Sequence, residues 1–97
     1  MVVHLVLFRL KPGIEANDPR LARLAADMDA LPSKIAQIRG WEHGPNLTRD
    51  ADAWDYGLRA TFENEAALYE YFEHPAHLPV LEGWNEIASL AFADFRP

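Results

Sequence analysis

The sequence contains no cysteine, and this absence excludes disulfides, thiolate metal sites and a cysteine nucleophile. Basic residues are also scarce, because nine Lys and Arg stand against fifteen Asp and Glu, for a net charge of −6. A negatively charged surface repels nucleic acid, so we expect no nucleic-acid partner. The longest apolar run, residues 2–8, is far shorter than the roughly 20 residues of a membrane-spanning helix. We therefore expect no membrane partner.

Several sequence signals are missing as well. The chain has no glycine-rich phosphate loop, no dinucleotide fingerprint and no HExxH pair, so no cofactor and no metal are expected. Its first residues carry no basic region of the kind that opens a signal peptide, and we expect a cytoplasmic protein. A length of 97 residues leaves room for one domain, spanning residues 1–97.

Hydrophobic periodicity and turn residues divide the chain into seven elements. The predicted strands are residues 2–10, 35–41 (with a weaker continuation to 43), 54–62 and 89–95. The predicted helices are residues 19–31, 65–73 and about 75–87. A turn is expected at residues 44–46, and it leads into a polar loop from 47 to 53. Proline punctuates these elements: Pro19 suits a first helical turn, whereas Pro32 and Pro75 are expected to end the helices that precede them.

The order strand-helix-strand-strand-helix-helix-strand predicts an α+β fold, a ferredoxin-like split βαβ with helices on one face of four antiparallel strands. The first strand is apolar on both faces, since Leu5 and Leu7 alternate with Val6 and Phe8. Helices cover only one face, and the other would expose a large apolar patch. We therefore expect a homodimer that packs its two sheets into a dimeric α/β barrel. The alternative is a monomer whose loop 47–53 folds over the sheet.

The segment from Tyr71 to His77, YFEHPAH, carries the most informative chemistry. Tyr71 closes one predicted helix and His77 opens the next, so a proline corner can direct both side chains into one space. A neutral imidazole and a phenol in a semi-apolar pocket suit proton transfer at a carbonyl, with the histidine as base and the tyrosine as donor. The competing interpretation is structural: a histidine beside a proline corner often hydrogen-bonds backbone groups.

Other titratable residues allow two interpretations each. His4, in the middle of an apolar strand, is either a core residue or part of a ligand site. Asp94, near the end of the last strand, either orients an imidazole or remains a solvent-exposed carboxylate. Glu73, His74 and His77 have the spacing of a partial metal site, but zinc takes at least three protein ligands and no matching carboxylate set appears.

Four segments in order resemble the stress-response α/β-barrel (Dabb) family: residues 4–10 (HLVLFRL), 38–46 (IRGWEHGPN), 56–63 (YGLRATFE) and 71–77 (YFEHPAH), with Asp94 and Phe95 closing the match. The resemblance implies a ferredoxin-like subunit in a dimeric barrel, and a link to stress response. One branch of the family comprises plant polyketide cyclases, which close a ring by aldol chemistry without metal or cofactor. By position, the resemblance implies Tyr71 and His77 as catalytic residues, His4 on the pocket wall and Asp94 in support of His77.

Strand parity and helix phase predict an apolar pocket wall. Its predicted members are Val6, Phe8, Leu21, Leu24, Leu58, Ala60, Leu68, Phe72 and Phe92. The expected function is therefore a small homodimer that binds an apolar or aromatic carbonyl-bearing molecule. If it is an enzyme, we expect cofactor-free, cyclase-like or lyase-like acid–base catalysis. The alternatives are a non-catalytic stress or assembly protein and a cofactor-independent oxygenase, against which the family motif argues.

Overall fold

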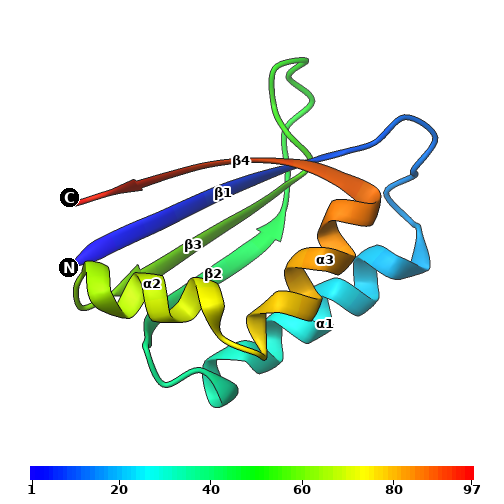
Figure 1. Ribbon diagram of the computed structural model, residues 1–97. Helices are drawn as coiled ribbons and strands as arrows, with labels where there is room; N and C mark the ends of the chain where they lie inside the picture. Colours follow the sequence, from blue (N-terminus) through cyan, green and yellow to red (C-terminus); the bar gives the residue numbers. More distant parts are fainter.

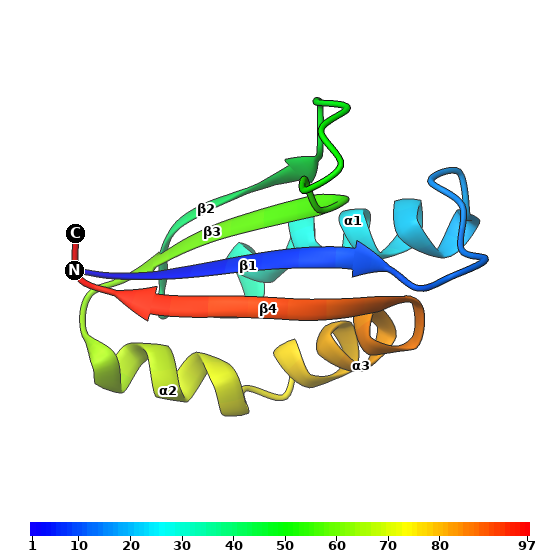
Figure 2. The ribbon, with the colours of Figure 1, turned by 90° about the horizontal axis from the view of Figure 1, so that it is seen from above.

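The computed structural model describes residues 1–97 as one antiparallel sheet with three helices on one face (Figures 1 and 2). The elements in chain order are β1 (Val2–Leu10), α1 (Pro19–Lys34), β2 (Ile38–Pro45), β3 (Tyr56–Phe62), α2 (Glu65–Glu73), α3 (His77–Ile87) and β4 (Ala88–Phe95). The strand order β2-β3-β1-β4 leaves β2 and β4 at the edges. The predicted ferredoxin-like α+β fold is confirmed. None of the helices is long and apolar enough to span a membrane.

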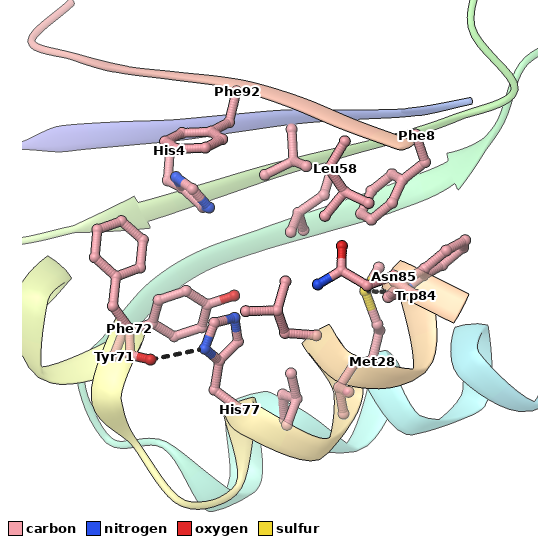
Figure 3. Close-up of a pocket in the computed structure, with 15 residues that line it drawn as sticks. His4, Phe8, Met28, Leu58, Tyr71, Phe72, His77, Trp84, Asn85 and Phe92 are labelled. Atoms are coloured by element: carbon pink, nitrogen blue, oxygen red, sulfur yellow. Dashed lines mark hydrogen bonds between the residues drawn. The ribbon is translucent and has the colours of Figure 1, made fainter. Parts of the chain in front are cut away.

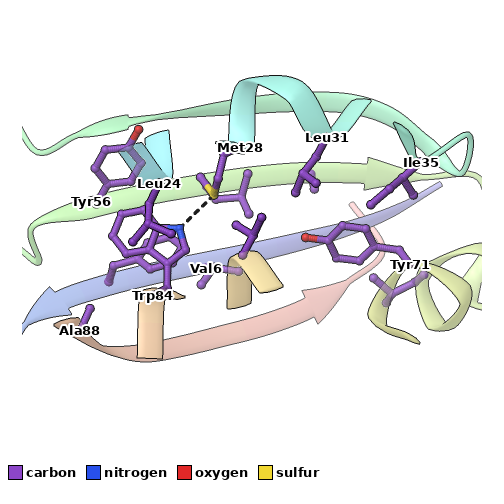
Figure 4. Packing of buried hydrophobic residues seen from close by; sticks show 14 of the residues in the cluster. Val6, Leu24, Met28, Leu31, Ile35, Tyr56, Tyr71, Trp84 and Ala88 are labelled. Atoms are coloured by element: carbon purple, nitrogen blue, oxygen red, sulfur yellow. Dashed lines mark hydrogen bonds between the residues drawn. The ribbon is translucent and has the colours of Figure 1, made fainter. Parts of the chain in front are cut away.

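The core lies between the sheet and the helices (Figure 4). Alternation along β1 directs Val6 and Phe8 toward the helices, and both are buried. The buried side chains of α1, Leu24, Met28 and Leu31, recur at helical spacing. On α3, the ring of Trp84 lies against that of Phe8, with their centroids 4.2 Å apart. These contacts hold α1 and α3 against the sheet.

Helix α1 continues through Pro32 and ends at Lys34, so the predicted end at Leu31-Pro32 is wrong. Proline has no N–H to donate to the carbonyl four residues earlier, which belongs to Met28. The indole N–H of Trp41, on β2, donates to that carbonyl at 3.0 Å. A side chain from the sheet therefore supplies the hydrogen bond that Pro32 cannot make, and the helix passes the proline intact.

Strand β2 is shifted relative to its prediction. The strand begins at Ile38 because Ile35 caps α1: the amide of Ile35 donates to the Leu31 carbonyl. It also runs on to Pro45, although Gly44-Pro45 was expected to open the loop. An edge strand tolerates proline, since one side of its backbone needs no partner. Strand β3 begins two residues later and β4 one residue earlier than predicted.

The second face of the sheet carries apolar side chains with no helix over them. Leu5 is 38% exposed and Leu7 is 41% exposed, and both point away from the helices. The loop between β2 and β3 projects beyond the sheet (Figure 1) and contacts it at Arg9, which approaches the Ala51 carbonyl. The loop therefore leaves Leu5 and Leu7 uncovered, contrary to the monomer with a folded-over loop.

Candidate functional site

A cavity of about 470 Å³ lies between the sheet and the helices (Figure 3). Such a volume suits a small organic ligand. Twelve of the fifteen lining residues are hydrophobic, which leaves two histidines and an asparagine. The lining residues are His4, Val6, Phe8, Met28, Leu31, Leu58, Tyr71, Phe72, His77, Val80, Leu81, Trp84, Asn85, Leu90 and Phe92.

Burial separates the floor of this cavity from its rim. The residues from β1, β3 and α1 are buried, whereas five lining residues from α2, α3 and β4 are half-buried or exposed: Phe72, Leu81, Asn85, Leu90 and Phe92. These five form the rim. Strand β4 is an edge strand, so the cavity opens between this strand and the helices α2 and α3.

The corner between α2 and α3 fixes the orientation of His77. Helix α2 ends before Pro75, because the residue that precedes a proline is driven out of the helical region. The ring Nδ1 of His77 lies 3.1 Å from the main-chain oxygen of Phe72, a carbonyl at the end of α2. A carbonyl only accepts hydrogen bonds, so Nδ1 carries the proton of the neutral ring and Nε2 is the unprotonated nitrogen.

Tyr71 lies beside His77, with the two ring centroids 4.3 Å apart. Its side chain is only 2% exposed, and the hydroxyl has no hydrogen-bond partner in the protein. No side-chain nitrogen or oxygen is both sealed from solvent and unpaired, so this hydroxyl and the Nε2 atom of His77 must both be reached from the cavity. Both polar atoms are therefore available to a ligand.

Burial shifts the pKa values of these two groups in a way that assigns their roles. Burial raises the pKa of Tyr71, so its hydroxyl stays protonated and acts as a donor near neutral pH. Burial lowers the pKa of His77 below its ordinary value of 6.5; the bond with the Phe72 carbonyl opposes this, and His4 and His74 lower it further. The imidazole is therefore neutral and acts as an acceptor at pH 7.

Asp94 pairs with His4. The two residues are opposite each other in the register of β1 and β4, and the carboxylate lies 2.5 Å from Nδ1 of His4. The carboxylate accepts a hydrogen bond from the Nδ1–H group, which leaves Nε2 of His4 as a second imidazole nitrogen available to a ligand in the cavity. The structure thus gives Asp94 to His4 in place of the expected support for His77, because strand register brings His4 to this carboxylate.

Comparison with known proteins identifies the family. The family model described as the stress responsive A/B barrel domain, Dabb, matches residues 2–96. This chain belongs to the Dabb family. An uncharacterized protein of Streptomyces coelicolor is 34% identical to it over 96 residues, and the match covers 99% of each chain.

Solved structures share the Dabb fold of this chain. A protein of Bacteroides fragilis, described as dimeric and of unknown function, is 29% identical with a TM-score of 0.85, covering 99% of this chain and 95% of that one. The hydroxynitrile lyase of Passiflora edulis is 19% identical with a TM-score of 0.82, covering 97% and 90%. At this identity the second likeness shows the fold alone.

The structure brings eight of the thirteen sequence-predicted site residues of this Dabb protein onto the cavity wall. They are His4, Val6, Phe8, Leu58, Tyr71, Phe72, His77 and Phe92. The other five, Leu21, Leu24, Ala60, Leu68 and Asp94, do not line the cavity.

Each of these five residues lies in another part of the protein or does not reach the cavity. Leu24 packs over Gly83 of α3, where an added Cβ would lie 2.7 Å from the leucine side chain, and Leu21 is half-buried against the core. Ala60 is fully buried and too short to reach the cavity. Leu68 and Asp94 line a smaller cleft at the other end of β1. Parity and helical phase give the face of an element, whereas position along its axis decides which side chains reach a cavity.

The sequence-based wall omitted seven residues: Met28, Leu31, Val80, Leu81, Trp84, Asn85 and Leu90. Three of those on α3 follow His77 at intervals of three, four and seven residues, the spacing of one helical face. That spacing was a usable signal. The structure contains no group of three or more His, Asp or Glu side chains that could hold a metal ion, and His74 instead accepts the amide of Ala76 at 3.0 Å.

Proposed function

We propose that this Dabb protein binds an apolar or aromatic carbonyl-bearing small molecule in its cavity and transforms it by acid–base chemistry. One observation carries the proposal: a phenol and two imidazole nitrogens open into a largely apolar cavity at one end. In such a cavity the apolar wall would hold the body of the ligand. The polar atoms would then meet its carbonyl group.

The reaction would begin with proton transfer. His77 Nε2 removes a proton from the carbon next to the carbonyl, and the C–H electron pair forms the C=C bond of an enolate. The Tyr71 hydroxyl donates a hydrogen bond to the enolate oxygen. In an aldol reaction the enolate carbon attacks a second carbonyl, and the imidazolium returns its proton to the new alkoxide. Acid–base help of this kind accelerates a reaction roughly 10²–10⁴-fold.

His4 and Asp94 supply a second polar site on the facing strand. The carboxylate pairs with Nδ1 of His4 and fixes the orientation of its ring, as in other carboxylate–imidazole pairs. The rings of Phe72 and Phe92 lie within 6 Å of His4, with centroid distances of 5.2 and 5.8 Å. We assign Nε2 of His4 to bind a polar group of the ligand, because His77 alone completes the proton transfer.

One comparison shows that an enzyme exists on this fold. The hydroxynitrile lyase of Passiflora edulis has the same fold, so the fold accommodates a lyase. Polyketide cyclase-like chemistry, a part in stress response and a cytoplasmic location remain predictions from the sequence.

A homodimer is part of the proposal. The related protein of Bacteroides fragilis is described as dimeric, and so is a protein of Thermobifida fusca with a TM-score of 0.87 and 20% identity. The uncovered face of the sheet, with Leu5 and Leu7, is the surface through which we expect two copies to pack.

A second function is favoured by one contact. The bond from His77 Nδ1 to the Phe72 carbonyl satisfies the end of α2, which is what a purely structural corner requires. In that case the protein would be a non-catalytic stress or assembly protein. No ligand would then stabilise it.

A thermal-shift screen against aromatic, polyketide-like and lactone compounds, with the His77→Ser variant alongside, tests the proposal. A ligand at 100 times its dissociation constant stabilises the native state by about 2.7 kcal/mol, which raises the melting temperature by roughly 10 °C. We expect hits that weaken in the variant. A variant that melts early, together with no shift by any compound, would establish the structural function instead.

A further inference from the structure

The polar groups of the cavity wall are unevenly distributed. His4, Tyr71 and His77 gather at one end. The centroid of the Tyr71 ring lies 6.0 Å from that of His4 and 4.3 Å from that of His77. Asn85 is the one other lining residue with a polar side chain capable of pairing with a ligand, apart from the Trp84 indole, which donates to the Met28 sulfur. A ligand would therefore meet polar atoms at two separate places.

Helix α3 sets the separation between these places. His77 is the first residue of α3, and Asn85 follows it by eight residues. A rise of about 1.5 Å per residue puts their backbones roughly 12 Å apart along the helix axis. Between them α3 presents Val80 and Leu81 to the cavity, so the intervening wall is apolar.

The carboxamide of Asn85 has unused hydrogen-bonding capacity. Its main-chain oxygen accepts from the Lys11 ammonium at 2.6 Å, but its side chain has no hydrogen-bond partner in the protein. Figure 3 shows this side chain directed from α3 into the space beneath the sheet. One amide oxygen and one NH₂ group can serve a hydroxyl or a carbonyl equally well.

We propose that Asn85 determines specificity by binding a second polar group of the ligand at the cavity rim. The ligand class is then an elongated apolar carbonyl compound with a hydroxyl or carbonyl at its outer end. Its reactive carbonyl lies at Tyr71 and His77, and its outer oxygen lies at Asn85. This inference rests on the proposed function, and it adds the length and the polarity pattern of the ligand.

The apolar rim explains why a single amide can discriminate between ligands. The half-buried or exposed rim residues other than Asn85 are Phe72, Leu81, Leu90 and Phe92, and none of their side chains offers a hydrogen bond. A ligand hydroxyl placed among them finds no side-chain hydrogen-bond partner in the protein other than the Asn85 carboxamide. Asn85 is therefore the residue that can favour a ligand with a polar outer end.

Calorimetric titration with two probes tests the proposal. The probes are methyl heptyl ketone and the same ketone with a terminal hydroxyl, each titrated into the wild type and the Asn85→Leu variant. The substitution keeps the approximate side-chain size and removes both amide groups. We expect the ratio of the two dissociation constants to shift against the hydroxyl by roughly threefold to tenfold, the effect of one net hydrogen bond.

Two further variants keep the result interpretable. Glu82→Leu adds the same side chain at an exposed position of α3 and should leave the ratio unchanged. Asn85→Asp retains an acceptor and should preserve tolerance of the hydroxyl. If both ketones bind and Asn85→Leu leaves their ratio unaltered, the specificity role of Asn85 is overturned while the proposed function stands. If neither ketone binds the wild type, both are overturned.

Discussion

The two nitrogens of His77 have different tasks, and two substitutions separate them. Nδ1 donates to the Phe72 carbonyl, while Nε2 is available to the cavity. His77→Ser removes both groups. His77→Asn retains a side-chain N–H close to the position of Nδ1 and removes Nε2. The structural function of the corner and its chemistry can therefore be lost separately.

The size of the structural effect follows from the lost bond. The bond is half-buried, and the loss of one such hydrogen bond costs about 0.5–1.5 kcal/mol; in a domain of this size each kcal/mol lowers the melting temperature by roughly 4–8 °C. His77→Ser should therefore melt about 2–12 °C below the wild type, and His77→Asn should melt close to it. Circular dichroism melts of the three proteins measure this. An Asn variant that melts as early as the Ser variant would refute the assignment of the Phe72 bond.

Three other predictions concern the dimer, α1 and acid stability. Changing both Leu5 and Leu7 to Thr should raise the dissociation constant of the dimer by about two orders of magnitude, because both subunits lose apolar area from the interface. Sedimentation velocity measures this, and an unchanged particle size would contradict it. Trp41→Phe should lower the free energy of unfolding, measured with urea, by about 1 kcal/mol, because the Met28 carbonyl loses its donor. The loss should be smaller in a Pro32→Ala background, where the alanine N–H can donate to that carbonyl. Equal losses in the two backgrounds would show that the Trp41 indole does not replace the hydrogen bond that Pro32 cannot make. Folding lowers the pKa of His77, so below about pH 6.5 the unfolded chain binds a proton that the folded protein does not, and the free energy of unfolding falls on acidification. Between pH ~7.5 and ~5.5 the free energy of unfolding should therefore fall less for His77→Asn than for the wild type. Equal losses would count against a buried neutral ring.

The fold could be predicted from the sequence because local patterns agree with the tertiary arrangement. The apolar, β-branched run of β1 and the caps at Asp18 and Asn64 each indicate the element that forms. Pro32 could not be predicted correctly, since its tolerance depends on the indole of Trp41 from a strand that is distant in the sequence. Local propensity contains no information about such a partner.

The candidate site could be predicted in part. Tyr71 and His77 are close in sequence, so a corner motif is enough to bring them together. The pairing of Asp94 with His4 spans ninety residues and depends on strand register, which no local pattern specifies. The cavity itself depends on where side chains fail to fill the space between layers. Helical spacing from His77 places Asn85 on the same face of α3, but it does not show that this face borders a cavity.

Proton abstraction by His77 is tested most directly by exchange of the α-protons of methyl heptyl ketone in deuterated buffer, followed by proton NMR. It reports proton abstraction directly and requires no knowledge of the natural substrate. We expect exchange at least about 100-fold faster with the wild type than with His77→Asn or Tyr71→Phe, while the exposed control Glu82→Gln matches the wild type. Exchange at the rate of buffer alone, or equal rates for all four proteins, would contradict it.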